Sequence, residues 1–149
     1  KFCEDNDVEV FYVTNRNQGE ETFQLALDNL RAAHLPFAQP ANLRVLRSTS
    51  NKEEVQDTIR EKYEVVALLG DNLNDFSRKY YSTDVDERAR LMSEDSASFG
   101  HEYILFPNPT DGHWIRAIFG QSEPAPNDEN RNILRDAASI NRWNPNKNN

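Results

Sequence analysis

The chain is short of cysteine, of positive charge and of long apolar runs, and each shortage excludes a class of protein. With one cysteine, Cys3, it forms no internal disulfide and no zinc site built from cysteines. None of its apolar runs is long enough to span a membrane. Its 17 basic residues against 25 acidic ones give a formal net charge of −8, which leaves no basic face for a phosphate backbone. We therefore expect no nucleic-acid polymer as a partner.

The length of 149 residues is that of one domain. We assign residues 1–143 to it and treat the asparagine-rich residues 144–149 as a frayed tail. The first six residues are typical of the end of a helix that precedes a strand, which indicates that the chain begins in the middle of a domain. Its three histidines are scattered, without the spacing of metal ligands.

Two kinds of apolar pattern alternate along the chain and predict the fold class. Short β-branched or aromatic stretches indicate strands, and stretches with apolar residues on one face indicate helices. Strands are predicted at 8–13, 43–46, 64–69 and 103–106, and helices at 20–33, 52–62, 76–81, 84–98 and 127–140, with a helix or turn at 113–119. Strands that alternate with helices form a parallel sheet flanked by helices, so the predicted fold class is α/β.

The most informative segment is 70–76, Gly-Asp-Asn-Leu-Asn-Asp-Phe, which follows the apolar run 65–69. That run is typical of a buried parallel strand, so Asp71 and Asp75 follow the carboxyl end of a strand, where α/β sheets bind ligands. Two nearby carboxylates repel each other unless a cation or a proton-sharing partner lies between them, and the simplest cation is Mg²⁺. Mg²⁺ suits this position because it takes a few carboxylates and keeps water and phosphate oxygens as further ligands. The segment therefore predicts metal-assisted phosphate chemistry, with Asp71 as the metal ligand.

Both acids also have ordinary explanations. Gly-Asp-Asn favours turns, so Asp71 can equally be a turn carboxylate or a helix cap. Asp75 can be a solvated acid at the start of a helix, or it can hold a cationic side chain. The segment alone leaves these alternatives open.

Polar residues also follow the first two predicted strands. Thr14 and Asn15 offer a hydroxyl and a backbone N–H to phosphate oxygens, although they can simply cap a loop. Lys52 starts a helix, where its charge opposes the helix dipole, so it either serves a phosphate or Asp75, or is an exposed surface lysine. We interpret Arg16 as a structural ion-pair partner rather than a phosphate clamp. Because the carboxyl ends of parallel strands share one edge, we expect these residues to lie together.

Several motifs follow one another in a characteristic order. They are Phe-Tyr-Val-Thr-Asn-Arg at 11–16, Lys52, the acidic segment with its preceding leucine at 69–76, and a strand-like stretch at 99–108. Together they resemble the haloacid dehalogenase superfamily and, within it, the class C acid phosphatases, a bacterial group of lipoprotein acid phosphatases and 5′-nucleotidases. The resemblance covers roughly residues 1–120 and implies the Rossmann-like haloacid dehalogenase fold.

The resemblance implies a role for each candidate residue. Thr14 and the Asn15 amide resemble the second-motif groups that bind the transferring phosphoryl group, and Lys52 resembles the lysine that neutralises its charge. Asp71 resembles the fourth-motif magnesium ligand, and Asp75 the acid that positions Lys52. The implied protein is an Mg²⁺-dependent acid phosphatase that hydrolyses phosphomonoesters through an aspartyl-phosphate. A non-catalytic phosphate-binding or storage-type protein on the same fold is the alternative, and a phosphotransferase is a weaker one.

One departure from the family is large. The first motif, Asp-x-Asp-x-Thr, which supplies the nucleophile, is not found before Thr14. Asp84 and Asp86 form an Asp-x-Asp, but they follow the fourth motif in a helical stretch, so we reject them as the nucleophile. The missing motif belongs to the central strand, without which two flanking strands lose a hydrogen-bonded neighbour. We expect both on an amino-terminal segment that partners this chain, and we expect the chain alone to be inactive.

A second departure concerns the substrate. Nucleotide-cleaving relatives tend to carry an aromatic residue before the glycine that corresponds to Gly112, whereas this chain has Asp111. Nucleoside monophosphates therefore stay an open alternative, with Trp114 as a partial substitute in the pocket wall. The other aromatic residues from Tyr80 to Phe106 are predicted to be mostly core. Because the relatives are exported, we expect a periplasmic, outer-membrane-anchored or secreted protein of the cell envelope.

Overall fold

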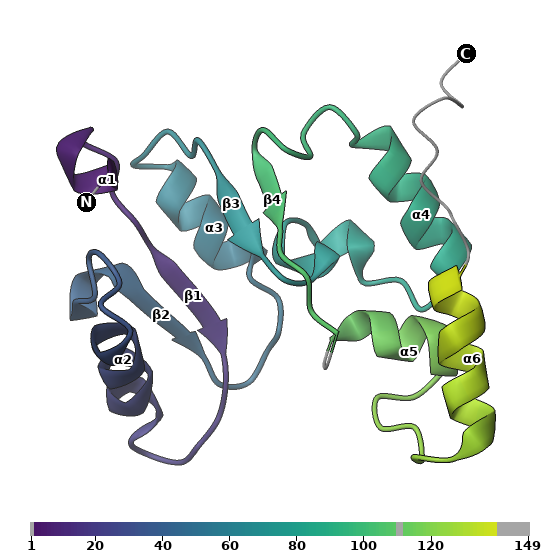
Figure 1. Cartoon of the computed structure of the whole chain (residues 1–149). Coiled ribbons are helices and arrows are strands. Elements are labelled where there is room, and N and C mark those ends of the chain that lie inside the picture. Colours follow the sequence, from purple (N-terminus) through teal and green to yellow (C-terminus); the bar gives the residue numbers. More distant parts are fainter. Residues whose placement is uncertain (1, 110–111, 140–149) are drawn as a thin grey trace. The chain divides into compact units, whose positions relative to one another are not determined.

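The computed structural model describes residues 2–109 and 112–139 (Figure 1). The chain divides into two compact units, residues 1–63 and 64–149, and each unit has its own two-stranded parallel sheet. The single domain predicted over 1–143 stays a prediction, and the predicted tail at 144–149 lies outside the described residues. None of the helices in the described ranges has the length and apolar character needed to cross a membrane.

The first unit contains two strands that pair in parallel. Its elements are α1 (Phe2–Asp5), β1 (Tyr12–Asn15), α2 (Thr22–Ala32), η1 (Pro40–Asn42), β2 (Leu43–Leu46) and α3 (Glu53–Arg60). Strand β2 has the predicted bounds, but β1 begins and ends later than the predicted 8–13. Thr14 and Asn15 are strand residues, not loop residues, because they pair with Val45 and Leu46 of β2.

The core of the first unit lies where α2 meets the sheet (Figure 1). Ala26 and Leu27 of α2 and Leu43 of β2 are each at most 3% exposed. The half-buried residues around them are Tyr12, Leu30 and Val45. The two buried helix residues lie within the amphipathic pattern that predicted a helix at 20–33, so burial of one helix face explains why this segment is helical.

The second unit also has a parallel strand pair, β3 (Leu68–Gly70) and β4 (Tyr103–Leu105), with Leu68 opposite Tyr103. Its other elements are η2 (Leu73–Asp75), η3 (Arg78–Tyr80), α4 (Val85–Glu94), α5 (His113–Phe119) and α6 (Asp128–Ser139). The parallel direction of both strand pairs confirms the predicted sheet type. Helices α5 and α6 lie against each other (Figure 1).

Aromatic rings form the core of the second unit. Phe76 is 2% exposed and Tyr80 is fully buried. The ring of Tyr103 stacks on Phe76 with 4.9 Å between centroids, and Phe99 meets Phe76 edge-on at 5.8 Å. The predicted core role is confirmed for Tyr80, Phe99 and Tyr103 but is wrong for Phe106, which is 50% exposed.

The prediction of a buried strand over 64–69 is wrong in two respects. The strand is shorter and lies later, at Leu68–Gly70, and Leu69 is 64% exposed. Within this unit β3 pairs with β4 on one side, and the described residues leave the face that carries Leu69 open to solvent. An apolar run predicts that a strand forms, but not how many neighbours cover it.

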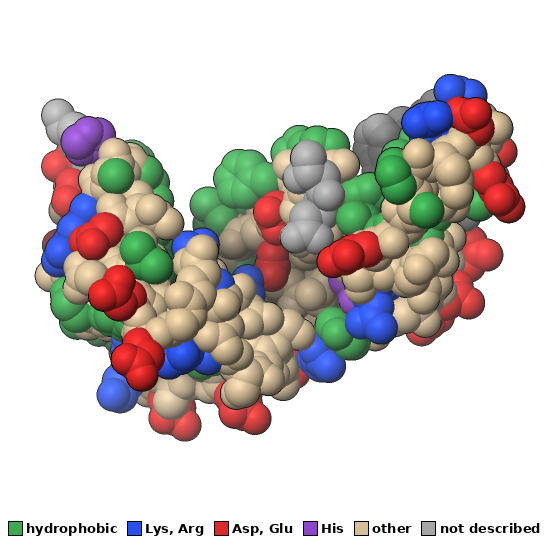
Figure 2. Space-filling model, turned by 90° about the horizontal axis from the view of Figure 1, so that it is seen from below, with side chains coloured by type: hydrophobic (Ala, Val, Ile, Leu, Met, Phe, Trp, Pro, Cys, Tyr) green, Lys and Arg blue, Asp and Glu red, His purple; other side chains and the backbone are tan. Residues whose placement is uncertain are grey.

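Charged side chains are dispersed over the surface. On the face that Figure 2 shows, acidic and basic side chains of the described residues alternate in small groups, and no basic patch extends across that face.

Candidate functional site

The acidic loop after β3 is closed by one of its own carboxylates. Asp75 Oδ2 accepts hydrogen bonds from the backbone N–H groups of Asp71 at 3.2 Å and Asn72 at 3.1 Å. A Cβ atom at Gly70 would lie 2.6 Å from Asp75 Cβ, so the loop closes this tightly because residue 70 is glycine. Asp75 therefore stabilises the conformation of its own loop. Its predicted role of holding Lys52 stays a prediction.

The Asp71 carboxylate is the exposed acid of this loop. It lies directly after the carboxyl end of β3, and its Oδ1 accepts a hydrogen bond from Asn72 Nδ2 at 3.0 Å. The described residues contain no group of three or more histidine, cysteine, aspartate or glutamate side chains placed to share a metal ion. Mg²⁺ needs no such cluster, because one or two carboxylates suffice when water and phosphate oxygens complete its shell. The exposed oxygen ligand at Asp71 fits that ion.

Asn72 connects the loop to helix α5. Its Oδ1 accepts a hydrogen bond from the His113 backbone N–H at 3.2 Å, while its Nδ2 donates to Asp71. Gly112 precedes the helix with φ of +140°, and a Cβ there would lie 2.1 Å from Asn72 Oδ1. Sequence analysis did not identify Asn72 or this role of Gly112. The available signal was a glycine directly before a helix.

Replacement of Gly112 tests this connection. We expect Gly112→Ala to lower the free energy of unfolding by about 3 kcal/mol, because the new methyl group meets Asn72 and the backbone adopts a strained φ. Gly100→Ala is the matched control, since Gly100 also has a positive φ of +82° but open space around its Cβ. Its expected cost is about 1 kcal/mol, from the backbone alone. Equal losses in urea unfolding would show that the close approach to Asn72 carries no energy.

Helix α5 also brings a buried histidine beside the loop. His113 is 8% exposed and stacks on Tyr81 with 3.9 Å between ring centroids, and its Nε2 has no hydrogen-bond partner among the described residues. Burial lowers the pKa of His113 below its ordinary value, and three guanidinium groups lower the pKa further. These groups belong to Arg88, Arg116 and Arg78.

The lowered pKa predicts a pH dependence of stability. The unfolded chain, with a histidine pKa of about 6.5, binds this proton more readily than the folded one. The free energy of unfolding that the neutral His113 contributes is therefore fully present above about pH 6.5 and is lost as the pH falls below it. We expect wild-type stability to drop more than that of His113→Phe between about pH 7.5 and 5.5, measured by urea unfolding. Parallel profiles would contradict the assignment.

The first unit places the phosphate-binding candidates at the carboxyl end of β1. Thr14 Oγ1 accepts a hydrogen bond from Arg16 Nε at 3.3 Å. The Arg16 backbone N–H donates to Leu46 of β2, so by strand alternation the Asn15 N–H points away from β2. Among the described residues Arg16 forms no ion pair, and its side chain bonds the Thr14 hydroxyl, so its interpretation as an ion-pair partner stays a prediction.

Lys52 lies immediately before helix α3, as predicted. It is the residue that precedes Glu53, and its carbonyl accepts the first helical hydrogen bond from Gln56 at 3.0 Å. Asn51 Oδ1 accepts from the Glu53 N–H at 3.2 Å and so caps this end. The structure thus brings Asp71 together with Asp75, and Thr14 with Asn15. That these residues and Lys52 form one site stays a prediction.

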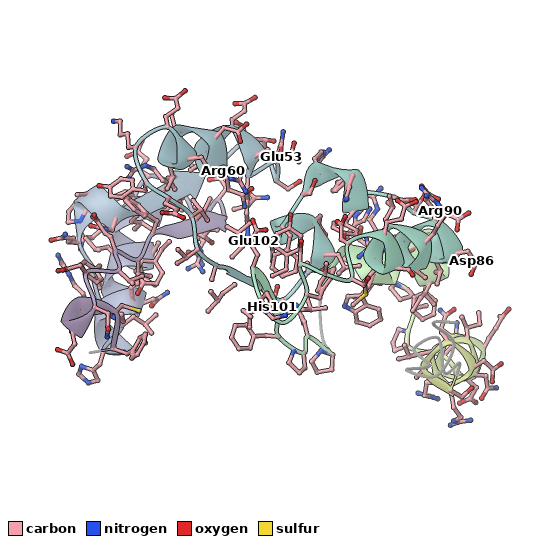
Figure 3. All side chains as sticks on the ribbon, turned by 90° about the horizontal axis from the view of Figure 1, so that it is seen from above. Glu53, Arg60, Asp86, Arg90, His101 and Glu102 are labelled. Carbon is pink, nitrogen blue, oxygen red and sulfur yellow. The ribbon has the colours of Figure 1, made fainter. Side chains whose placement is uncertain are left out.

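The Asp-x-Asp formed by Asp84 and Asp86 lies at the start of a helix, in agreement with its rejection as the nucleophile. Asp84 caps α4, because its Oδ1 accepts from the backbone N–H groups of Asp86 at 2.8 Å and Glu87 at 3.0 Å. Asp86 is exposed in the first helical turn and lies on the outer side of α4 with Arg90 (Figure 3).

Comparison with known proteins identifies relatives of the chain. The model of the HAD superfamily, subfamily IIIB (acid phosphatase), matches residues 1–114. The class C acid phosphatase of Bacillus anthracis is similar in structure, with a TM-score of 0.76 and 24% identity over 96% of this chain and 58% of that one. The same protein with tungstate bound gives a TM-score of 0.74 and 23% identity, over 96% and 59% of the two chains. The chain thus spans less than two thirds of these structures.

Proposed function

The chain belongs to subfamily IIIB of the HAD superfamily, the acid phosphatases, and on this premise we propose that it carries part of the active site of a phosphomonoesterase. Its membership confirms the resemblance found in the sequence, and the likeness to solved structures confirms the predicted α/β fold class. The activity, the metal and the substrate are what we propose.

One observation carries this proposal, the arrangement of the acidic loop. Asp75 is engaged by two backbone N–H groups, whereas the Asp71 carboxylate is exposed at the end of a parallel strand. Because Asp75 is occupied by these hydrogen bonds and Asp71 is exposed, Asp71 is the better candidate for the ligand of Mg²⁺. When bound, the ion would supply positive charge to the oxygens of a transferring phosphoryl group.

The residues of the first unit would bind that phosphoryl group. The Thr14 hydroxyl lies at the end of β1, and the neighbouring Asn15 N–H points away from the β2 ladder, which supports the proposal that both donate to phosphate oxygens. The Lys52 ammonium group would neutralise the phosphoryl charge, with Asp75 as its positioning residue. Arg16 would hold the Thr14 side chain in one orientation through their hydrogen bond.

The proposed reaction is hydrolysis of a phosphomonoester through an aspartyl-phosphate whose nucleophile lies outside this chain. This fits a chain that spans 58% of the B. anthracis enzyme and in which the first acid of the Asp84–Asp86 pair caps a helix. Nucleoside monophosphates are one possible substrate class, and Asp111, which bears on that choice, lies outside the described residues. We keep an exported, cell-envelope location as part of the proposal.

Metal removal tests the proposal. The natural protein that contains this chain should hydrolyse an aryl phosphate, lose that activity on chelation and regain it when Mg²⁺ is restored. The activity should depend on Lys52, because Lys52→Met removes the charge that offsets the phosphoryl group. Phosphate binding without turnover in the presence of Mg²⁺ would instead favour the non-catalytic, storage-type alternative.

A further inference from the structure

A cleft of about 490 Å³ lies in the second unit, between the loops that follow β3 and β4 and the helices α4, α5 and α6. Its walls are mainly apolar, and they include Met92 of α4, Leu105 at the end of β4, Trp114 and Ile118 of α5, and Leu134 of α6. Trp114, which the sequence offered as a wall residue of a pocket, is thus part of the wall of this cleft. A cleft of this size accommodates a small organic molecule.

A buried arginine interrupts the apolar wall. Arg88 is 6% exposed, and its Nη1 donates a hydrogen bond to the Tyr80 carbonyl. Within the described ranges no carboxylate pairs with this guanidinium, and Asp71, which also lines the cleft, forms no ion pair with it. Arg90, two residues along α4, is by contrast exposed and paired with both Glu87 and Glu94 (Figure 3).

A buried charge without a counter-charge is costly, and the structure shows that cost. Burial lowers the pKa of Arg88, and no acidic group opposes that change. The charges of Arg88, Arg116 and Arg78 also lower the pKa of the neighbouring His113, so three guanidinium groups act on this side of the cleft, although the whole chain has a net charge of −8. An anion in the cleft would remove the cost, because guanidinium groups bind carboxylates and phosphates through several N–H groups at once.

We propose that this cleft binds a small organic anion, with the anionic group on Arg88 and the apolar body against Trp114 and the side chains around it. The donors left on the guanidinium after its bond to Tyr80 serve the anion, and the ring of Trp114 offers a flat surface for an aromatic body. The cleft shares Asp71 with the proposed metal site, but the inference does not rest on the proposed function, because binding of the anion needs neither a metal nor a phosphoryl transfer.

Binding of two matched probes tests the inference on the natural protein that contains this chain. Biphenyl-4-carboxylate and its neutral analogue biphenyl-4-carboxamide have nearly the same shape, so calorimetric titration of both isolates the contribution of the charge. We expect the carboxylate to bind at least about tenfold more tightly, although the chain is negatively charged overall. Equal affinities, or no binding of the carboxylate, would overturn the proposal. Neither outcome would bear on the phosphatase activity.

Two variants on one helix assign the preference to a residue. Arg88→Met keeps a long side chain in the wall and should abolish the preference for the carboxylate. Arg90→Met removes a charge outside the cleft and should leave the preference unchanged. A folded Arg88→Met variant that still prefers the carboxylate would contradict the assignment.

A third variant covers the case in which Arg88→Met does not fold. Ala137 of α6 lines the cleft, and Ala137→Phe places a ring in that space while Arg88 is retained. We expect this variant to lose carboxylate binding, which would support the location. Unchanged binding would place the probe elsewhere and overturn the proposal.

Discussion

The variant Asp71→Asn of the natural protein is expected to turn over phosphomonoesters about a hundredfold more slowly than the wild type, or worse, in the presence of Mg²⁺. The amide removes the anionic ligand that the proposal assigns to the metal, and metal charge is worth several kcal/mol in a phosphoryl-transfer transition state. The fold should be unaffected. Asp71 is exposed, and its side chain is engaged by the neighbouring Asn72, so the free energy of unfolding should stay within about 0.5 kcal/mol of the wild type.

Asp86→Asn is the matched control for this result. Asp86 is an exposed aspartate, and it belongs to the Asp-x-Asp pair that the structure places in α4. Its replacement should leave the turnover number unchanged. If Asp86→Asn abolished turnover, the rejection of that pair would be wrong. If Asp71→Asn turned over at the wild-type rate, the metal assignment would be wrong, whatever the family of the chain.

The variant Phe76→Ala is expected to destabilise the second unit by about 3–5 kcal/mol. Phe76 is 2% exposed, and it contacts Tyr103 by stacking and Phe99 edge-on, so truncation leaves a cavity that these rings cannot fill. Because Phe76 directly follows Asp75, the loss also releases the end of the acidic loop. Urea unfolding followed by circular dichroism measures the effect.

Phe106→Ala provides the comparison within the same unit. Phe106 is 50% exposed, so its truncation should cost about 1 kcal/mol, well below the loss at Phe76. Similar losses at the two positions would mean that Phe106 is covered in solution by something the described residues do not contain. A small loss at Phe76 would show that the aromatic cluster is not the core of this unit.

Local sequence patterns predicted where helices and strands form better than they predicted how these elements pair and which residues they bury. Strand β2 was predicted with its actual bounds, and the helices α2, α4 and α6 lie within their predicted ranges, because hydrophobic periodicity depends on neighbouring residues. The end of β1 was predicted too early, since the pairing of Thr14 and Asn15 with β2 is decided by a strand about 30 residues away. Leu69 was predicted to be buried because it is apolar, but the sequence does not show whether another element covers that side chain.

In the candidate site, too, features within one short segment were predicted and contacts between distant segments were not. Asp71 and Asp75 are four residues apart, and the motif that contains them predicted that they lie in one loop, which the structure confirms. The contact of Asn72 with the start of α5 spans 41 residues, and nothing in either segment identifies the other. Arg88 was missed for a related reason. An arginine on a helix is usually solvated, and its burial follows from packing that no local pattern records.

The side chain at position 72 sets the charge that the acidic loop presents. Its amide is neutral and two-ended, with the oxygen turned to the first N–H of α5 and the nitrogen to Asp71. An aspartate here would keep the acceptor but lose the donor, and it would set a second carboxylate against the first. The side chain next to Asp71 must therefore donate one hydrogen bond and accept another while it carries no charge. Among side chains of this size, asparagine meets that requirement. Position 72 therefore favours asparagine between two acids with different roles, the exposed Asp71 and the loop-closing Asp75.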